Sequence, residues 1–155
     1  MPKIMMSRLR AQAAGSTALA GCLVAVMMQV AGGDLARHLP PAPLFQISAG
    51  FGAGAAGALL AGGFGHGRWR GHLLGALSAV LATVIGASLG AIIAMGVAAR
   101  AVQPRVMFDV LEIAPALGLM AIADGVVTSV PVAITWALSL AAVHLLMHQR
   151  RQATI

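Results

Sequence analysis

Charged residues are scarce in this 155-residue chain, where they make up 9% of the sequence against 59% hydrophobic residues. With a mean hydropathy of +0.91, the chain has too little polar surface to keep a globule of this length in solution. The solvent must therefore be lipid, in which every backbone N–H and C=O group needs an internal partner. Because the apolar stretches do not alternate with polar residues as barrel strands do, we predict an all-α integral membrane protein.

Residues that carry chemistry are also few. The chain has one cysteine, which excludes an internal disulfide, and four acidic residues. No serine, cysteine, histidine and carboxylate set converges by spacing, and no glycine-rich loop follows a strand. We therefore expect neither enzyme activity nor a cofactor.

Long uncharged stretches make up most of the chain. At a rise of ~1.5 Å per residue, about 20 helical residues cross a ~30 Å hydrocarbon layer, and each stretch is long enough to do so. We predict membrane-spanning helices over residues 11–32, 44–63, 72–99 and 125–147, within a single domain covering residues 1–155.

The ten lysine and arginine residues divide unevenly between the two sides that four spans imply. One side holds Lys3, Arg8, Arg10, Arg68, Arg70, Arg150 and Arg151, and the other holds Arg37, Arg100 and Arg105. Since positive residues favour the cytoplasmic side, we expect both termini in the cytoplasm and the protein in a bacterial cytoplasmic (inner) membrane. The basic side would attract anionic lipid headgroups, and we expect no nucleic-acid partner.

A short amphipathic helix is predicted over residues 105–118, before the last span. Arg105, Asp109 and Glu112 fall within a narrow arc of that helix, and the first two form an i, i+4 pair. We favour an interfacial helix that caps the bundle. The alternative is an external cation site made by Asp109, Glu112 and Asp124, although their spacing matches no known loop.

Small residues form the strongest internal pattern. They recur every four residues as Gly50, Gly54, Ala58 and Gly62 in the second predicted span, and as Ala82, Gly86, Gly90 and Ala94 in the third. Such strips allow helix backbones to approach closely, which is how helices associate in lipid. We therefore predict a Gly/Ala-packed four-helix bundle in which these strips form the seam. The alternatives are a homo-oligomer contact and a contact with a partner subunit in a larger membrane complex.

The segment Leu19-Ala20-Gly21-Cys22, which follows a basic start and a short apolar run, resembles the lipobox of bacterial lipoproteins. That resemblance implies that Cys22 is acylated after signal cleavage. The apolar run continues beyond Cys22, where a lipoprotein carries a polar tether, so we favour an uncleaved first span in which Cys22 packs as a small buried residue. A conventional signal peptide ending near Ala31 is a third alternative.

Five histidines raise the question of a metal or haem site. His144 and His148 are one turn apart at the end of the last predicted span, and His66 and His72 lie on the same predicted side. An i, i+4 pair can chelate a metal ion. Histidine near a helix C-terminus is also favoured by the helix dipole, and no carboxylate is predicted nearby to orient the rings, so we favour the structural role.

Asp124 allows two interpretations. If the last span begins at residue 125, Asp124 caps its N-terminus and satisfies free N–H groups. If the helix begins near Pro115 instead, Asp124 lies within the membrane, where a carboxylate is costly and usually functional, and Pro131 loosens the same helix. Length favours the cap. Trp136 favours the deeper register, which brings it to the inner interface.

Two classes of function remain. The first, which we favour, is a non-catalytic packing, accessory or assembly subunit with few buried polar groups. The second is a small channel or transporter component in which Asp124 and the polar residues Gln29, Gln46, Thr128 and Ser129 line a path.

Overall fold

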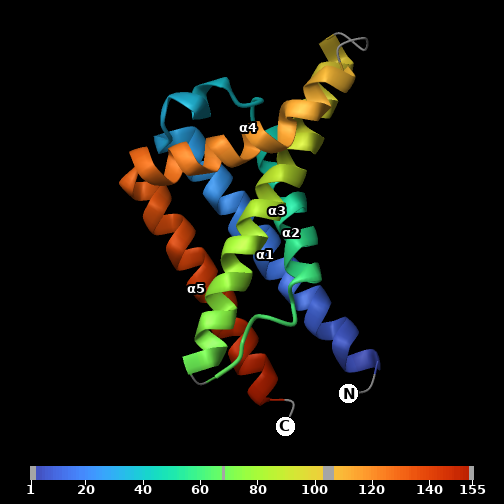
Figure 1. The fold of residues 1–155 in the computed structure, drawn as a ribbon, viewed down its shortest axis with the longest axis vertical. Helices are drawn as coiled ribbons and strands as arrows, with labels where there is room; N and C mark the ends of the chain where they lie inside the picture. The colour runs from blue at the N-terminus through green and yellow to red at the C-terminus, as the bar shows by residue number, and fades with distance from the viewer. Residues whose placement is uncertain (1–2, 68, 103–106, 154–155) are drawn as a thin grey trace.

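The computed structural model describes residues 3–67, 69–102 and 107–153, and within these ranges every regular element is helical. In chain order the helices are α1 (Lys3–Ala31), the short 3-10 helix η1 (Asp34–His38), α2 (Leu44–Leu59), α3 (Trp69–Val102), α4 (Met107–Thr128) and α5 (Val130–Gln152) (Figure 1). The prediction of an all-helical chain is confirmed for the described residues.

Four of these helices, α1, α3, α4 and α5, are long and apolar enough to cross a membrane. α2 has only 16 residues and is therefore about 24 Å long. The span predicted over residues 44–63 stops at Leu59, where a turn begins in which the Gly63 N–H donates to the Leu60 carbonyl at 2.9 Å. The cause lies in the glycines that follow, since glycine is a poor helix former.

The boundary between the last two helices also differs from the prediction. One helix runs from Met107 to Thr128 in place of a short helix over residues 105–118, and residue 105 lies outside the described residues. α5 begins at Val130 and ends at Gln152, so its helix bounds differ from the predicted range of residues 125–147.

Ser129 separates α4 from α5. Its backbone is extended, with φ −127° and ψ 107°, and its hydroxyl accepts a hydrogen bond from the Val132 N–H at 3.5 Å. This is the N-cap geometry that serine favours. Pro131 occupies the first turn, where a proline needs no N–H partner, so it begins a helix instead of loosening one.

The helices form a bundle in which α2 lies between α1 and α3 and packs against both, while α5 packs mainly against α1 (Figure 1). α4 packs on α3 and crosses the end of the bundle at which η1 lies. The start of α1 and the end of α5 lie near the opposite end, where the loop of residues 60–67 that follows α2 also lies (Figure 1). We call these two ends the η1 end and the loop end.

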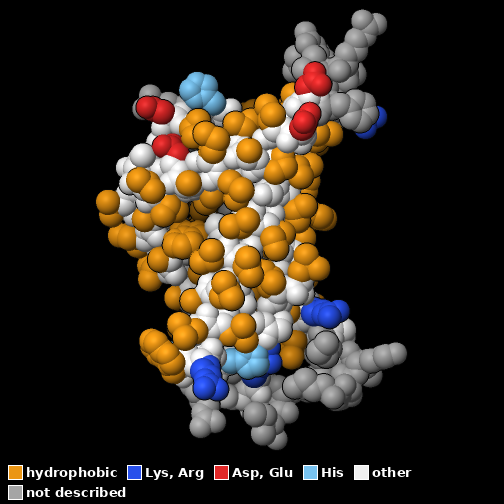
Figure 2. All heavy atoms as spheres, in the orientation of Figure 1, with side chains coloured by type: hydrophobic (Ala, Val, Ile, Leu, Met, Phe, Trp, Pro, Cys, Tyr) orange, Lys and Arg blue, Asp and Glu red, His pale blue; other side chains and the backbone are white. Residues whose placement is uncertain are grey.

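Charge and hydrophobicity follow the long axis of the molecule. Figure 2 shows the acidic side chains at the η1 end, where a basic side chain also lies, and further basic side chains at the loop end, with mostly hydrophobic side chains between them. Large apolar residues such as Leu19, Phe51 and Leu138 are exposed on this middle surface. Such exposure is compatible with a lipid solvent, because lipid tails are as apolar as these side chains.

Two clusters of buried apolar side chains form the core. The cluster towards the loop end includes Phe64, Val143 and Met147, together with alanines from α1, α2 and α3. The cluster towards the η1 end contains Val24, Met28, Ala121 and Val132. Both clusters depend on small residues, which bring the helices close enough for the few large side chains to touch.

Glycines of α2 face both neighbouring helices. A Cβ atom at Gly52 would meet the Gly86 carbonyl oxygen of α3 and lie 2.6 Å from the Gly90 nitrogen. On the other face, a Cβ atom at Gly54 would lie 3.2 Å from the Ala14 carbonyl oxygen of α1. The backbone of α2 therefore lies close to the backbone of α3 on one face and to that of α1 on the other.

Gly52→Ala should consequently destabilise the protein. The added methyl group meets backbone atoms, which cannot move aside as a flexible side chain can, and overpacking of this kind costs roughly 1–3 kcal/mol. The measurement is the melting temperature in mild detergent, which should fall.

Gly15→Ala in α1 is the matched control, because a Cβ atom there meets nothing within 4 Å. Alanine is a better helix former than glycine by roughly 0.5–1 kcal/mol, so this variant should melt at the same or a higher temperature. If Gly52→Ala melts like Gly15→Ala, the close contact between α2 and α3 is refuted.

Candidate functional site

Asp124 lies in the last turns of α4, at the η1 end. Its Oδ2 atom accepts a hydrogen bond from the Leu35 N–H at 3.3 Å, and a Cβ atom at Gly33 would meet the same carboxylate. Asp124 does not cap α5, because Ser129 is the N-cap of that helix. It lies instead inside α4, which begins at Met107 and not near Pro115. The carboxylate therefore joins α4 to the start of η1.

The other polar residues proposed for a path are bonded within the protein. The Gln46 side-chain amide donates to Gln29 Oε1 at 2.9 Å, and the Gln29 amide donates to the Pro40 carbonyl at 3.4 Å. The Thr128 hydroxyl donates to the Asp124 carbonyl at 2.7 Å. The two glutamine bonds join the end of α1, the segment between η1 and α2, and the start of α2. The Thr128 bond lies within the last turn of α4.

Arg151 organises the loop end. Its Nε donates to the Phe64 carbonyl at 2.9 Å, and its Nη2 donates to the carbonyls of Ala61 and Gly62 at 3.1 and 3.2 Å. These carbonyls follow α2 and have no partner within a regular helix, so a cation from α5 satisfies them. Phe64 itself is completely buried, which fixes the loop on its other side.

His144 and His148 bind the same loop. Gly65, which has a positive φ of 77°, donates its N–H to His144 Nδ1 at 3.4 Å, and its carbonyl lies 3.1 Å from His148 Nδ1. A Cβ atom at Gly65 would lie 2.5 Å from the Met147 carbonyl carbon, so only glycine fits here. Together with Arg151, these two histidines form what we call the loop latch.

The loop latch explains why His144 and His148 are one turn apart, which is the spacing that suggested a metal site. The Nδ1 atoms of both histidines face Gly65, and the His144 ring lies against Gly75 of α3, with its centroid 5.4 Å from that of His72. Among the described residues, no three His, Cys, Asp or Glu side chains lie close enough together to hold a metal ion. Asp109, Glu112 and Asp124 are likewise not gathered into one site.

Cys22 lies on the face of α1 that contacts α2. Its thiol donates to the Gln46 carbonyl at 3.4 Å, and a Cβ atom at Gly50 would meet its sulfur. Of the other glycines singled out by spacing, Gly86 and Gly90 face α2, while a Cβ atom at Gly62 would meet nothing within 4 Å. Gly50 and Gly54 thus face α1, whereas the α3 glycines meet a different side of α2.

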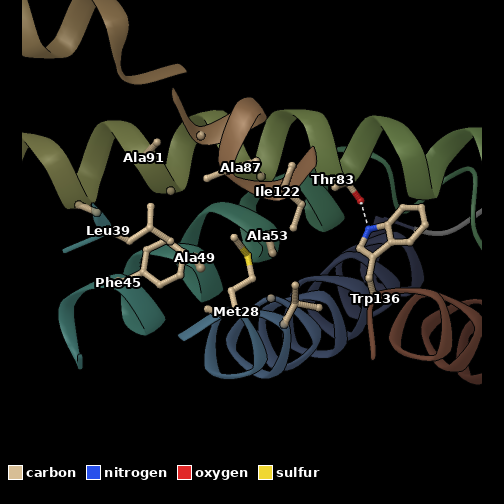
Figure 3. A pocket seen from close by; sticks show the side chains of 18 of the residues that line it. Met28, Leu39, Phe45, Ala49, Ala53, Thr83, Ala87, Ala91, Ile122 and Trp136 are labelled. Atoms are coloured by element: carbon tan, nitrogen blue, oxygen red, sulfur yellow. Dashed lines mark hydrogen bonds between the residues drawn. The ribbon is translucent and has the colours of Figure 1, made fainter. Parts of the chain in front are cut away.

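An apolar cavity of about 120 Å³ lies among the five α-helices (Figure 3). Small residues of α3 line one wall, namely Ala82, Gly86, Ala87, Gly90, Ala91 and Ala94. Met28, Leu39 and Phe45 line it towards the η1 end, and Trp136 lies on the opposite side in Figure 3. The cavity is partly open to the surroundings.

Trp136 reaches across from α5 to α3. Its indole Nε1 donates to the Thr83 hydroxyl at 3.0 Å, and the Thr83 hydroxyl donates in turn to the Ala79 carbonyl at 2.9 Å. The indole N–H of Trp136 is therefore satisfied inside the bundle. The other tryptophan, Trp69, is 75% exposed at the start of α3.

The sequence analysis missed the loop latch and the cavity. The sequence analysis used Arg151 only as a positive charge that indicates membrane orientation, because its hydrogen-bond partners lie about 90 residues away in the chain. The sequence did contain a signal for the loop latch. A glycine-rich loop lies on the same predicted side as a helix end that carries two histidines and an arginine, each one turn from the next. No sequence signal identified the cavity, which depends on how five helices fit together.

Arg151→Gln should loosen the loop latch. The variant loses three charge-assisted hydrogen bonds to carbonyls, and bonds to charged groups contribute roughly 1.5–3 kcal/mol each before compensation by other donors. We expect a lower melting temperature and faster amide hydrogen exchange over residues 61–65. Arg70→Gln removes the same charge from an exposed residue at the same end and should leave both values unchanged. Equal behaviour of the two variants would contradict the latch.

The charged and histidine side chains of the described residues therefore lie towards the two ends of the bundle, and an apolar cavity lies between them. Comparisons with protein-family models, with curated proteins and with solved structures returned no match for this chain.

Proposed function

We infer that this protein is a non-catalytic integral membrane protein that serves as a packing, accessory or assembly subunit. One observation supports the inference: charged side chains that could bind a substrate form hydrogen bonds with the protein's own backbone instead. Asp124 holds the Leu35 N–H, and Arg151 holds three loop carbonyls. Groups used in this way fix the ends of helices and are not available to a substrate.

The apolar exterior supports the membrane setting. Four helices are long and apolar enough to cross a bilayer, and large hydrophobic side chains cover the surface between the two ends. The basic loop end would then face the cytoplasm, with both chain termini on that side of a bacterial inner membrane, since Lys and Arg favour that side. The η1 end, which carries the acidic residues, would face outward.

Helix association in this setting would rest on the Gly/Ala strips. Lipid provides no hydrophobic force between helices, so contact depends on close packing and weak bonds. The approach of α2 to α1 through Gly54 and to α3 through Gly52 supports an internal seam. Contact with a second copy or a larger complex would then use the exposed outer faces of the bundle.

A channel is the alternative to this role. A path for ions needs polar groups or water through the middle of the bundle, because a charge in an apolar interior is costly. The interior space carries few polar atoms, and the amides of Gln29 and Gln46 bind one another near the η1 end. These observations favour the accessory role.

Asp124→Asn separates the two functions. In the accessory role the side chain acts as an acceptor for the Leu35 N–H, and the Asn carbonyl oxygen can accept the same bond. We therefore expect a nearly unchanged melting temperature for Asp124→Asn and a loss of about 1 kcal/mol for Asp124→Ala, as for a lost capping bond. The protein is reconstituted in liposomes, and proton and cation flux are measured on the same preparations that are melted.

Asp109→Asn is the control, because it removes an exposed carboxylate from the same helix. The accessory role predicts no flux above that of protein-free liposomes for the wild type or for either Asn variant. Flux in the wild type that disappears in Asp124→Asn, at unchanged melting temperature and with Asp109→Asn still active, would replace the accessory role by the channel.

A further inference from the structure

We propose that the cavity among the five α-helices is a binding site for one hydrocarbon chain of a membrane phospholipid, entering from the leaflet at the η1 end. This site goes beyond the accessory role and does not depend on it. It requires only that the bundle lies in a bilayer.

The lining of the cavity selects an apolar ligand. Among the residues that the structure describes, no charged one lines the cavity, and four of the lining residues have a polar side-chain nitrogen or oxygen: Thr17, Thr83, Trp136 and Ser139. Thr17 already donates to the Ala13 carbonyl at 2.7 Å, and Thr83 and Trp136 are bonded to each other. A buried water needs two to four polar partners, and this lining does not provide them. Hydrocarbon therefore fits the cavity better than water does.

The size of the cavity suits a single chain. Its volume of about 120 Å³ is close to the roughly 150 Å³ of an engineered apolar cavity that stays dry and binds benzene. A segment of a few methylene groups fills such a space. A helix from a second copy cannot enter it, because a helix with its side chains is about 10–12 Å across. The headgroup of a lipid would remain outside, since the described residues that line the cavity include no charged group to bind it.

The sequence keeps this space open. Most of the α3 wall consists of alanines and glycines between Ala82 and Ala94, and the larger α3 side chains that line the cavity are Thr83 and, beyond Ala94, Met95. α5 packs mainly against α1, and Trp136 bridges the distance to α3 through its hydrogen bond with Thr83. An unfilled space forfeits dispersion contacts on one side of every lining atom, and a hydrocarbon chain restores them.

The position of the cavity identifies the leaflet. Met28 lies in the last turn of α1, Leu39 follows η1, and Phe45 is the second residue of α2, so this side of the cavity belongs to the η1 end (Figure 3). Trp136 and Leu140 line it deeper along α5. A lipid of the leaflet at the η1 end can therefore place one chain between Phe45 and Trp136 while its headgroup stays at the membrane surface.

Trp136 reports directly on the occupant. In the Trp69→Phe variant it is the only remaining tryptophan, because the chain has two. The purified variant is titrated in mixed detergent micelles with a phospholipid brominated on its chains, since bromine quenches indole fluorescence on contact. A bound chain should quench Trp136 saturably at a low mole fraction of brominated lipid, whereas random contact rises in proportion to the mole fraction.

Ser139→Leu fills the cavity from α5, and Ile122→Phe fills it from α4 in case the first variant does not fold. Both should lose the saturable phase. Ala141→Leu adds similar bulk to an exposed position of α5 and should retain it. Quenching proportional to mole fraction in the Trp69→Phe protein, or a saturable phase unaffected by Ser139→Leu and Ile122→Phe, would overturn the proposal.

A brominated free fatty acid tests the source of the chain. If it produces the saturable phase and the phospholipid does not, a phospholipid is not the occupant and the proposal fails. Neither result bears on the flux measurements with Asp124→Asn, so the failure of this site and the failure of the accessory role can be told apart.

Discussion

The rest of the structure depends on the close approach of the α2 backbone to α1 on one side and to α3 on the other. α2 is the shortest of the five α-helices, and it can lie between two longer ones because glycine occupies both of its contact faces. This approach brings α1, α2 and α3 into one packed layer. α5 then packs along α1, and the space left between α3 and α5 becomes the cavity that Trp136 bridges.

Polar residues have a different task from the glycines. Asp124 joins α4 to the start of η1, and Arg151, His144 and His148 join α5 to the loop after α2. In each case a side chain from one helix satisfies backbone groups that a helix end or a turn leaves without a partner, which is a demand that apolar surroundings make strict. In the sequence these residues are candidates for a functional site, whereas in the folded chain their side chains form hydrogen bonds with the backbone.

The sequence predicted the helical class and the existence of the long apolar helices, because uncharged runs interrupted by prolines and glycines mark them directly. It placed the boundary between α4 and α5 wrongly, since residues 107–147 are almost continuously apolar and Ser129 with Pro131 is a short signal within them. Helical spacing assigned Gly50 and Gly54 to one face but could not identify α1 as the helix opposite. The bonds of Arg151 and the cavity arise only from contacts between segments distant in the chain.

A disulfide between α1 and α2 tests the central contact most directly. A Cβ atom at Gly50 would lie 3.9 Å from the Cβ atom of Cys22, within the range that a disulfide needs, and Cys22 is the only native cysteine. Under mild oxidation of Gly50→Cys, the account predicts an intramolecular Cys22–residue 50 bond, detected by peptide mass. Gly62→Cys, at a position where a Cβ atom meets nothing within 4 Å, should form none. A Gly50→Cys protein that stays reduced, or that links only to other copies, would contradict the account.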